Sequence, residues 1–336
     1  MDLKGKRIIL VTSMLFNYHL QIKECFEKMG AVVHLYDERN NPSSIEKILI
    51  RKARFLMRHR IKVYYSDICR RERDFNPDYI VFISPEAVTK NALNEMKSTF
   101  PNSYFILYMW DSVKNKHAND ILNSFDRRCS FDSADCKKYN MVFRPLFFSD
   151  GFRDDMKDKQ YRYDICFVGT VHSDRARIIW DLKEYCDANN MHYYFYLYVP
   201  GKLLYFLRRI TDSYFRKLEK YIHIDSLDNS EVARVSSLSR CIIDINHPSQ
   251  TGLTMRTIEM LGLNRKIATT NFNIREYDFY RPENQMVLER KNASIDKKML
   301  RQDYSVIPND IYLRYSIQYW ARDLFGINGE EIDYGK

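Results

Sequence analysis

The chain has 336 residues, of which 45% are apolar and 29% charged, and its formal net charge is +9. This length accommodates two domains with ample cores, and the composition excludes a globally disordered chain. The basic excess indicates an anionic partner, such as nucleotide phosphates, an acidic membrane surface or nucleic acid. No run of about 18 apolar residues occurs, which disfavours a membrane-spanning helix.

The cysteines and the first residues indicate the compartment. The seven cysteines are scattered, odd in number and without a Cys-x-x-Cys pair, which argues against a disulfide framework. Residues 1–16 place lysines before an apolar stretch but lack a small-residue cleavage site, so a first strand explains them better than a signal peptide. We therefore expect a reduced, cytoplasmic protein.

The N-terminal half, residues 1–150, alternates predicted strands and helices. Strands are predicted at 7–13, 31–36, 78–84, 103–110 and 127–131, and apolar residues at helical spacing predict a helix between the first two. This order predicts a Rossmann-like domain. The Gly-x-Gly-x-x-Gly fingerprint is absent, which disfavours a dehydrogenase.

Two polar residues follow strands of this half. His19 comes after the first strand, and Asp111 comes directly after the strand 103–110. Ligands of parallel sheets bind at the carboxyl ends of the strands, so Asp111, at the carboxyl edge of a central strand, is a candidate for a functional site. For Asp111 the alternative is a helix N-cap or a turn, which is the commoner role of an aspartate there.

The second half begins after a polar, charged stretch, 149–162, which we interpret as a linker. A strand is predicted at 163–168, followed by Gly169 and Thr170. A glycine at a strand end lets the backbone approach a ligand closely, although a plain tight turn is the alternative. Further strands are predicted at 192–199 and 285–288, and an amphipathic helix at 311–325 closes the chain.

The stretch 241–271 predicts a strand, a loop, a helix and a second strand. An apolar run at 241–245 precedes a turn-rich loop from Asn246 to Gly252, and helical spacing follows until Gly262 and Asn264. The helix start offers N–H groups and a partial positive charge, which suit a phosphate.

Arg256 lies about one turn into this helix, and Glu259 follows three residues later. A positive side chain near a helix start opposes the helix dipole, which is consistent with an anion bound beside it. The alternative is an ordinary surface pair at spacing i,i+3, worth a few tenths of a kcal/mol.

The run 251–262, TGLTMRTIEMLG, resembles the donor-binding segment of GT-B glycosyltransferases. It is most similar to a bacterial group of capsule and O-antigen synthesis, sometimes labelled CgeB-like. The resemblance implies an α/β GT-B fold with two Rossmann-like domains and a cleft between them. Residues 1–150 would then bind the acceptor, residues 151–309 would bind the donor, and a helix in 310–336 would cross back to the first domain.

In that group the helix holds the diphosphate of a nucleotide sugar, and its glutamate contacts the ribose. By resemblance, the donor-binding residues here are Gly169, Thr170, Asn246, Thr251, Gly252, Thr254, Arg256 and Glu259. Retaining GT-B enzymes often carry two glutamates eight residues apart, and this chain has Thr251 at the first position. We therefore expect an inverting enzyme, with Asp111 as the general base and His19 as the second candidate.

Motifs typical of other enzyme classes are absent from the sequence. The sequence has no Asp-x-Asp triplet, no P-loop and no zinc-type Cys/His spacing. We expect transfer without a metal or cofactor, from a UDP-sugar ahead of a GDP- or dTDP-sugar, to a lipid-linked glycan of a bacterial surface polysaccharide. Two alternatives stay open: a nucleotide-sugar epimerase of the same fold, and a non-catalytic protein that binds a membrane or nucleic acid.

Two basic segments with many apolar residues, 45–65 and 201–221, stand out. Amphipathic helices of this kind lie on anionic bilayers, here the inner face of the cytoplasmic membrane. The alternative, which we favour for both, is that the apolar residues pack in their own domain. A nucleic-acid partner is not expected, because no nucleic-acid-binding motif accompanies the charge.

Overall fold

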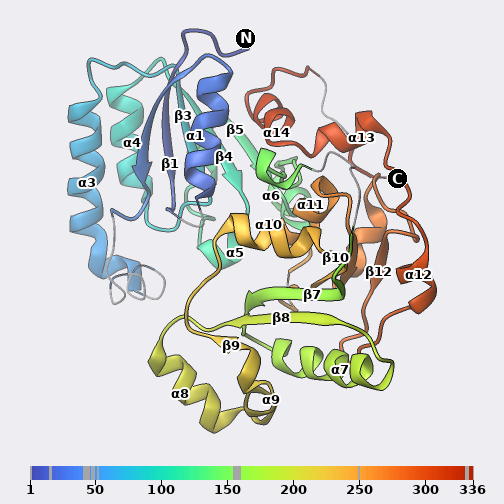
Figure 1. Cartoon of the computed structure of the whole chain (residues 1–336). Helices are drawn as coiled ribbons and strands as arrows, with labels where there is room; N and C mark the ends of the chain where they lie inside the picture. The colour runs from blue at the N-terminus through green and yellow to red at the C-terminus, as the bar shows by residue number, and fades with distance from the viewer. Residues whose placement is uncertain are drawn as a thin grey trace. The chain divides into compact units, whose positions relative to one another are not determined.

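The computed structural model describes residues 2–14, 17–40, 46, 50, 53–153, 160–248, 250–329 and 333–335. The chain divides into two compact units, which differ slightly from the predicted domains. Unit 1 comprises 1–145 and 317–333, and unit 2 comprises 146–316 and 334–336. In both units the described strands form a parallel six-stranded sheet (Figure 1).

The sheet of unit 1 has the strand order β2-β1-β3-β4-β5-β6. Its strands are β1 (Arg7–Thr12), β2 (Val32–Asp37), β3 (Tyr79–Ile83), β4 (Tyr104–Met109), β5 (Arg127–Ser130) and β6 (Val142–Phe143). Its helices are α1 (Tyr18–Lys28), α3 (Arg58–Arg71), α4 (Lys90–Thr99), α5 (Val113–Lys116), α6 (Ser133–Tyr139) and α14 (Ile317–Leu324), with the 3-10 turns η1 (Arg54–Met57) and η2 (Leu122–Ser124). The five predicted strands of this half are all present.

Helices cover both faces of the unit 1 sheet, and the central strands are therefore apolar throughout. Residues 8–11 of β1 and 80–83 of β3 are fully buried. On one face, α1 packs against α14, where the rings of Phe26 and Trp320 stack with centroids 6.2 Å apart. The last helix of the chain thus completes the core of the unit that contains the first strand.

The sheet of unit 2 has the strand order β12-β11-β10-β7-β8-β9. Its strands are β7 (Tyr163–Thr170), β8 (Tyr193–Tyr198), β9 (Ile222–His223), β10 (Ser239–Asp244), β11 (Lys266–Thr269) and β12 (Gln285–Val287). Its helices are α7 (Arg175–Ala188), α8 (Lys202–Thr211), α9 (Ser213–Lys217), α10 (Asn229–Ser237), α11 (Met255–Gly262), α12 (Lys297–Arg301) and α13 (Asn309–Arg314). Three 3-10 turns complete it: η3 (Asp150–Phe152), η4 (Glu219–Tyr221) and η5 (Phe272–Glu276).

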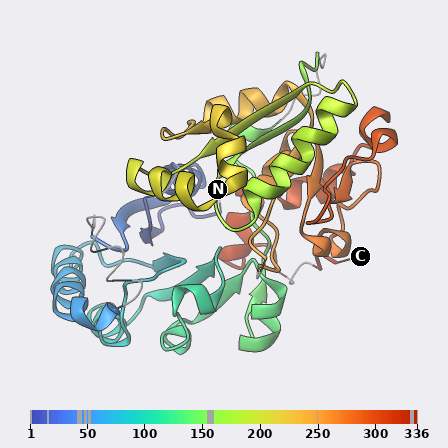
Figure 2. The same cartoon turned by 90° about the horizontal axis from the view of Figure 1, so that it is seen from below.

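The chain of unit 2 runs outward from β7 to β8 and β9 and then returns to the other side of β7, where β10, β11 and β12 follow. The order of strands therefore reverses between β7 and β10. As a result α7 lies on one face of the sheet and α10 and α11 lie on the other (Figures 1 and 2). Ligands of open parallel sheets bind at the carboxyl ends of the strands at such a reversal.

The structure corrects three local predictions. Gly169 and Thr170 do not form a turn but extend β7, because both continue the pairing with β8. The predicted helix 311–325 is two helices, α13 and α14, separated at Tyr315 and Ser316. Residues 149–152 of the predicted linker pack in unit 2, with Ser149 and Phe152 buried, and residues 154–159 lie outside the described residues.

Gly262 has a different role from the predicted helix stop, because it is the last residue inside α11. A Cβ atom there would lie 2.6 Å from Phe148 Cγ and still nearer the carbonyl oxygen of Phe152. The glycine thus lets α11 pack against the 148–152 backbone. Asn264, two residues later, takes the left-handed conformation that ends the helical path.

Candidate functional site

The site of unit 2 is built where the strand order reverses, at the carboxyl ends of β7, β10 and β11. Asp244 is the last residue of β10 and is buried. Its carboxylate accepts hydrogen bonds from the Thr257 hydroxyl of α11 and the Thr269 hydroxyl of β11, both at 3.0 Å. This carboxylate therefore fixes the helix to the strand ends.

Arg175, the first residue of α7, joins the ends of β7 and β10. Its Nη1 donates to the Thr170 carbonyl at 2.9 Å, and its Nε donates to the Ile245 carbonyl at 2.8 Å. Gly169 contributes to this arrangement, because a Cβ there would lie 3.5 Å from Arg175 Nη1 and 3.0 Å from the Phe167 ring. The small residue thus leaves room for the guanidinium beside β7.

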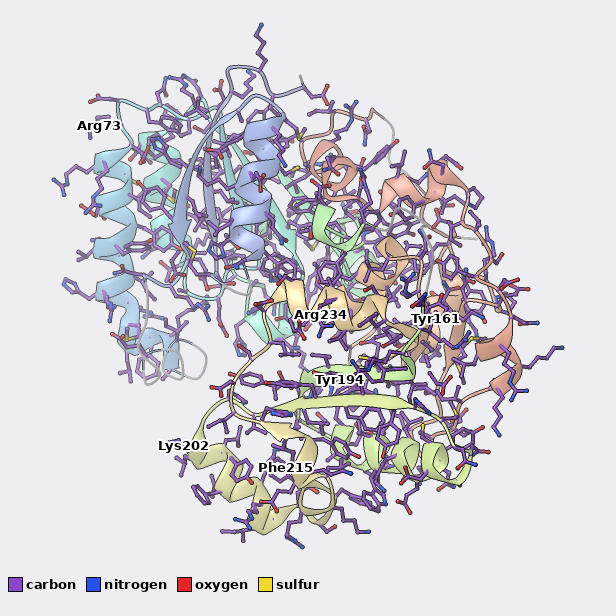
Figure 3. All side chains as sticks on the ribbon, in the orientation of Figure 1. Arg73, Tyr161, Tyr194, Lys202, Phe215 and Arg234 are labelled. Carbon is purple, nitrogen blue, oxygen red and sulfur yellow. The ribbon has the colours of Figure 1, made fainter. Side chains whose placement is uncertain are left out.

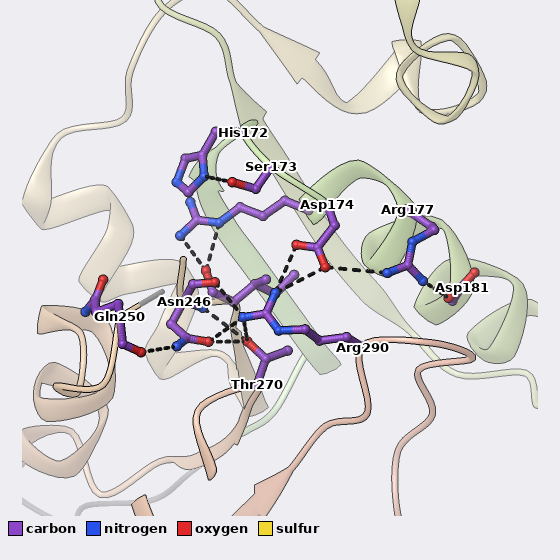
Figure 4. Close-up of polar contacts among 11 residues, drawn as sticks. His172, Ser173, Asp174, Arg177, Asp181, Asn246, Gln250, Thr270 and Arg290 are labelled. Atoms are coloured by element: carbon purple, nitrogen blue, oxygen red, sulfur yellow. Dashed lines mark hydrogen bonds and ion pairs between the residues drawn. The ribbon is translucent and has the colours of Figure 1, made fainter. Parts of the chain in front are cut away.

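Arg290 connects three further segments (Figure 4). Its Nη1 contacts both carboxylate oxygens of Asp174, at 2.9 and 3.1 Å. Its Nη2 donates to the side-chain oxygen of Asn246 at 2.8 Å, and the Thr270 hydroxyl donates to that same oxygen at 2.6 Å. The loops after β10, β11 and β12 and the start of α7 are therefore held together by side chains.

The loop before α11 is held by amide side chains. Asn246 donates to the Gln250 carbonyl at 2.9 Å, and Asn271 donates to the carbonyls of Thr251 and Gly252 at 3.0 and 3.1 Å. The side-chain oxygen of Thr254 caps α11 by accepting from the Thr257 N–H at 3.2 Å. The backbone that leads into the helix is therefore fixed in position, as a phosphate-binding turn requires.

Arg256 and Glu259 form an ion pair, with Arg256 Nη1 3.0 Å from Glu259 Oε2. The alternative of an ordinary surface pair does not apply, because the Glu259 side chain is only 3% exposed and the Arg256 side chain 21% exposed. The guanidinium has further N–H donors besides the one that faces Glu259. Arg256 therefore combines a buried partner with partial access to solvent.

Positive and negative side chains lie close together at the carboxyl ends of the strands of unit 2. Burial, followed by the nearby positive charges of Arg256 and Arg290, lowers the pKa of Arg175 to about 10, while Asp244 and Asp174 oppose this effect. Burial and the charge of Arg175 also lower the pKa of His172 to about 4, so this imidazole is neutral at pH 7. Three acidic residues, Asp174, Asp244 and Glu259, lie at the same strand ends as the three arginines.

Unit 1 contains both predicted catalytic residues. Asp111 follows β4 and has a half-exposed side chain, 46% accessible, with Lys116 Nζ 3.5 Å from its carboxylate. Asp111 does not have the alternative role of helix N-cap. The neighbouring Ser112 caps α5, because its hydroxyl accepts a backbone N–H from the first turn of that helix. His19 is the second residue of α1. The rings of Tyr18 and Trp110, which adjoin the two candidates, lie edge to face at 6.3 Å.

Asp111 belongs to a charged network that spans the carboxyl ends of β2, β3 and β4. Lys116 Nζ also lies 3.8 Å from Glu86, and Arg39 lies 3.3 Å from Glu38 and 3.9 Å from Glu86. Glu38 accepts the backbone N–H groups of Glu86 and Ala87 at 3.1 and 2.9 Å. Burial nevertheless raises the pKa of the Glu38 carboxyl to about 7.

The sequence analysis did not identify several residues that lie at the carboxyl ends of the strands in the two units. In unit 2 these are Asp174, Arg175, Asp244, Thr270, Asn271 and Arg290, and in unit 1 they are Glu38, Arg39, Glu86 and Lys116. Most of them lie within a few residues of the end of a parallel strand, so a search of every such position would have found them. Among the described residues, no group of three or more His, Cys, Asp or Glu side chains is arranged to hold a metal ion.

No protein-family model matches the chain, and no curated protein matches it. Several solved structures are similar to the chain. Anabaena HepE in complex with UDP and glucose has a TM-score of 0.58 and 8% identity, covering 96% of this chain and 99% of that chain. The lipopolysaccharide outer core galactosyltransferase WaaB has a TM-score of 0.52 and 12% identity, with 95% and 98% covered.

The UDP-GlcNAc 2-epimerase of Methanocaldococcus jannaschii, solved with UDP-GlcNAc and UDP, is also similar, with a TM-score of 0.50, 13% identity, and 95% and 99% covered. At these identities the likeness concerns the fold alone. The chain has the α/β GT-B fold with two Rossmann-like units, as its sequence predicted.

Proposed function

We propose that this chain is a metal-independent glycosyltransferase that transfers a sugar from a UDP-sugar to a lipid-linked glycan in bacterial surface polysaccharide synthesis. The single observation that carries the proposal is the start of α11. It lies where the strand order of unit 2 reverses, and it carries the partly exposed Arg256 beside a rigidly held loop. Structures of the same fold have been solved with UDP-sugars, which supports this choice of donor.

In this proposal unit 2 binds the leaving group. When the bond between the sugar and the diphosphate breaks, negative charge develops on the diphosphate oxygen. The N–H groups at the start of α11 and the Arg256 guanidinium stabilise that charge without a metal ion. Thr254 and Asn271 contribute by holding the helix start and its loop in place before the substrate arrives.

The acceptor hydroxyl loses a proton as it attacks the anomeric carbon. We assign this proton to the carboxylate of Asp111, which is accessible and lies two residues beyond the end of β4, and we keep His19 as the second candidate. Attack opposite the leaving diphosphate inverts the anomeric configuration. The presence of Thr251 at the position of the first glutamate of retaining enzymes supports inversion.

A thermal-shift series with UDP, UDP-sugars, GDP and dTDP tests donor binding. A ligand at about 100 times its Kd stabilises the folded protein by about 2.7 kcal/mol, so the true donor nucleotide should raise the melting temperature measurably. Arg256→Ala should reduce this response, because the variant loses the cation at the helix start.

Arg234→Ala is the matched control, since Arg234 on α10 also pairs with a glutamate three residues away, Glu231, but on an exposed surface (Figure 3). Its nucleotide response should equal that of the wild type. An unchanged response in Arg256→Ala would overturn the phosphate role of this arginine. The absence of any nucleotide response in the wild type would overturn the proposed function.

An epimerase is the second candidate function, because an epimerase structure of this fold covers nearly the whole chain. Incubation with a UDP-sugar alone separates the two functions. An epimerase interconverts the free nucleotide sugar, whereas a transferase releases UDP only when a glycan acceptor is added. Interconversion without acceptor would replace the leading proposal by the second.

A further inference from the structure

The helix α8 of unit 2 exposes an unusually apolar face. Leu203 and Ile210 are each 76% exposed, Phe206 is 56% exposed and Leu207 is 51% exposed. In the helix of ten residues, none is buried. At about 100° per residue these four side chains fall on one side of the helix, within an arc of about 100°. They therefore form a continuous apolar stripe, which we call the α8 stripe.

The opposite side of α8 fastens it to the rest of unit 2. The Tyr205 ring lies edge to face against Phe215 of α9 at 5.6 Å, and its hydroxyl donates to Glu219 at 2.7 Å. Arg216 donates to the carbonyls of Arg209 and Ile210 at 3.0 Å, which satisfies groups at the end of the helix. The orientation of α8 is thus fixed with the stripe outward, and Phe215 points into the unit (Figure 3).

The segment that carries the stripe is basic. The segment 202–221 contains six basic residues, Lys202, Arg208, Arg209, Arg216, Lys217 and Lys220, against the acidic Asp212 and Glu219, which gives a formal charge of +4. Asp212 lies 3.5 Å from Arg208, and Glu219 lies 3.2 Å from Arg209, so both acidic groups are already paired. An exposed apolar face on a segment of net positive charge matches an anionic bilayer.

We propose that the α8 stripe docks unit 2 onto an anionic lipid bilayer, with α8 lying in the plane of the interface. Within the described residues no helix is long and apolar enough to cross a membrane. A helix of about 15 Å that lies in the interface inserts its apolar side chains below the headgroups, and its basic side chains contact lipid phosphates.

A second copy of this chain fits the stripe less well. In a two-fold dimer the same surface faces itself, so the two segments of charge +4 would oppose each other. The bilayer provides the opposite charge. This surface therefore goes beyond the sugar-transfer proposal, because it assigns a lipid partner to an element outside the strand ends that bind the donor.

Sedimentation with vesicles tests the proposal. The wild type should bind vesicles of phosphatidylglycerol and phosphatidylcholine, should bind pure phosphatidylcholine weakly, and should be released as NaCl rises from about 0.1 M to about 0.5 M. Leu203→Glu/Ile210→Glu should reduce binding by about tenfold or more, because two inserted side chains become charged.

Val32→Glu/Val306→Glu is the matched control, because both valines are more than half exposed and lie outside α8. It should bind vesicles within about twofold of the wild type. Failure of the wild type to bind anionic vesicles overturns the proposal, and so does undiminished binding by Leu203→Glu/Ile210→Glu. A concentration-dependent dimer that this variant abolishes would assign the stripe to a second copy instead.

The UDP thermal shift of the same variant distinguishes a failure of the membrane proposal from a failure of the proposed function. The α8 variant should retain the wild-type shift, because α8 lies on the β9 side of the sheet while the donor residues surround α11. Loss of vesicle binding with a retained shift supports membrane docking. Loss of both indicates misfolding, and Leu203→Ser/Ile210→Ser, which introduces no charge, then provides the decisive measurement.

Discussion

The two sheets have the same parallel construction but opposite chemistry at their carboxyl ends. In unit 2 three arginines approach the strand ends, each in contact with an acidic or carbonyl oxygen. In unit 1 three carboxylates, Glu38, Glu86 and Asp111, gather around Arg39 and Lys116. The comparison shows that one parallel-sheet construction can carry different charged groups at its strand ends, and under the proposed function each set would have its own role.

Burial and contacts separate the members of each edge into different roles. Glu38 is buried and holds the Glu86–Ala87 backbone, whereas Asp111 at the other end of the same network is accessible. In unit 2 Arg175 and Arg256 are both partly buried, but Arg175 donates to the Thr170 and Ile245 carbonyls, whereas Arg256 pairs with Glu259. The contacts of Arg175 hold the strand ends together, and the proposed function assigns Arg256 to the substrate.

The largest effect should come from the accessible carboxylate of unit 1. Asp111→Asn should lower turnover by about 10²- to 10⁴-fold, the usual contribution of a general base, with nucleotide binding unchanged. Steady-state kinetics with a UDP-sugar and a glycan acceptor, together with the UDP thermal shift, measure the two quantities.

Asp126→Asn is the matched control for that variant. Asp126 also lies 3.5 Å from a lysine, Lys97, and is similarly exposed, but it precedes β5 and so lies at the amino ends of the strands. Its turnover should stay near the wild-type value. Full activity of Asp111→Asn would remove Asp111 as the base and would leave His19 as the candidate to substitute next.

The second prediction concerns the buried carboxylate of the same edge. The pKa of Glu38 is raised from 4.5 to about 7 by burial, so the folded state holds its proton more tightly than the unfolded state does. Its contribution to stability is therefore complete below pH 4.5 and is lost as the pH rises through about 7, by on the order of 3 kcal/mol.

Glu38→Gln should remove this pH dependence, because the amide does not titrate. Urea unfolding followed by the fluorescence of Trp110 and Trp320, both in unit 1, measures the free energy of unfolding from pH 4.5 to about 8. The exposed Glu24→Gln on α1 serves as the control and should retain the wild-type slope. Equal slopes in the wild type and Glu38→Gln would contradict the raised pKa.

The sequence predicted the sheets well because buried parallel strands appear as apolar runs between turn residues. The helix that begins after Thr254 was also predictable, since its apolar spacing and the cap at its start are local signals. The contacts between segments far apart in the chain were not predictable. Arg290 and Asn246 are 44 residues apart in the chain, and only the sheet order brings them together.

The two basic segments, 45–65 and 201–221, show a second limit of prediction from sequence. In the first segment Ile61 and Tyr65 of α3 are buried in the core of unit 1, but Phe55 and Leu56 are 62% and 61% exposed, so core packing is confirmed only in part. In the second segment α8 has no buried residue, whereas Phe215 of α9 is buried. Both segments alternate apolar and basic residues, so the sequence pattern does not distinguish an apolar face that packs inside from one that stays outside. Residues 45, 47–49 and 51–52 of the first segment lie outside the described residues.

The smallest expected effect concerns how α11 is held beside the strand ends of unit 2, where the three arginines lie. Replacing a helical glycine by alanine ordinarily stabilises a helix by about 1 kcal/mol. At Gly262 the sign should reverse, because the added Cβ would overlap Phe148 and the Phe152 backbone, and a backbone atom cannot rotate away. We expect Gly262→Ala to destabilise unit 2 by about 1–3 kcal/mol and to weaken the UDP thermal shift, since displacing α11 also displaces Thr254 and Arg256.

Gly151→Ala is the control for that variant, because a Cβ at Gly151 meets no atom within 4 Å. Urea unfolding followed by the fluorescence of Trp180, which lies in unit 2, should separate the two variants. A Gly262→Ala variant as stable as the wild type would show that α11 is not held by its contact with residues 148–152. The position of Arg256 would then depend on the contacts at the start of α11, foremost the Asp244–Thr257 hydrogen bond, and Thr257→Val should produce the loss of UDP response that Gly262→Ala did not.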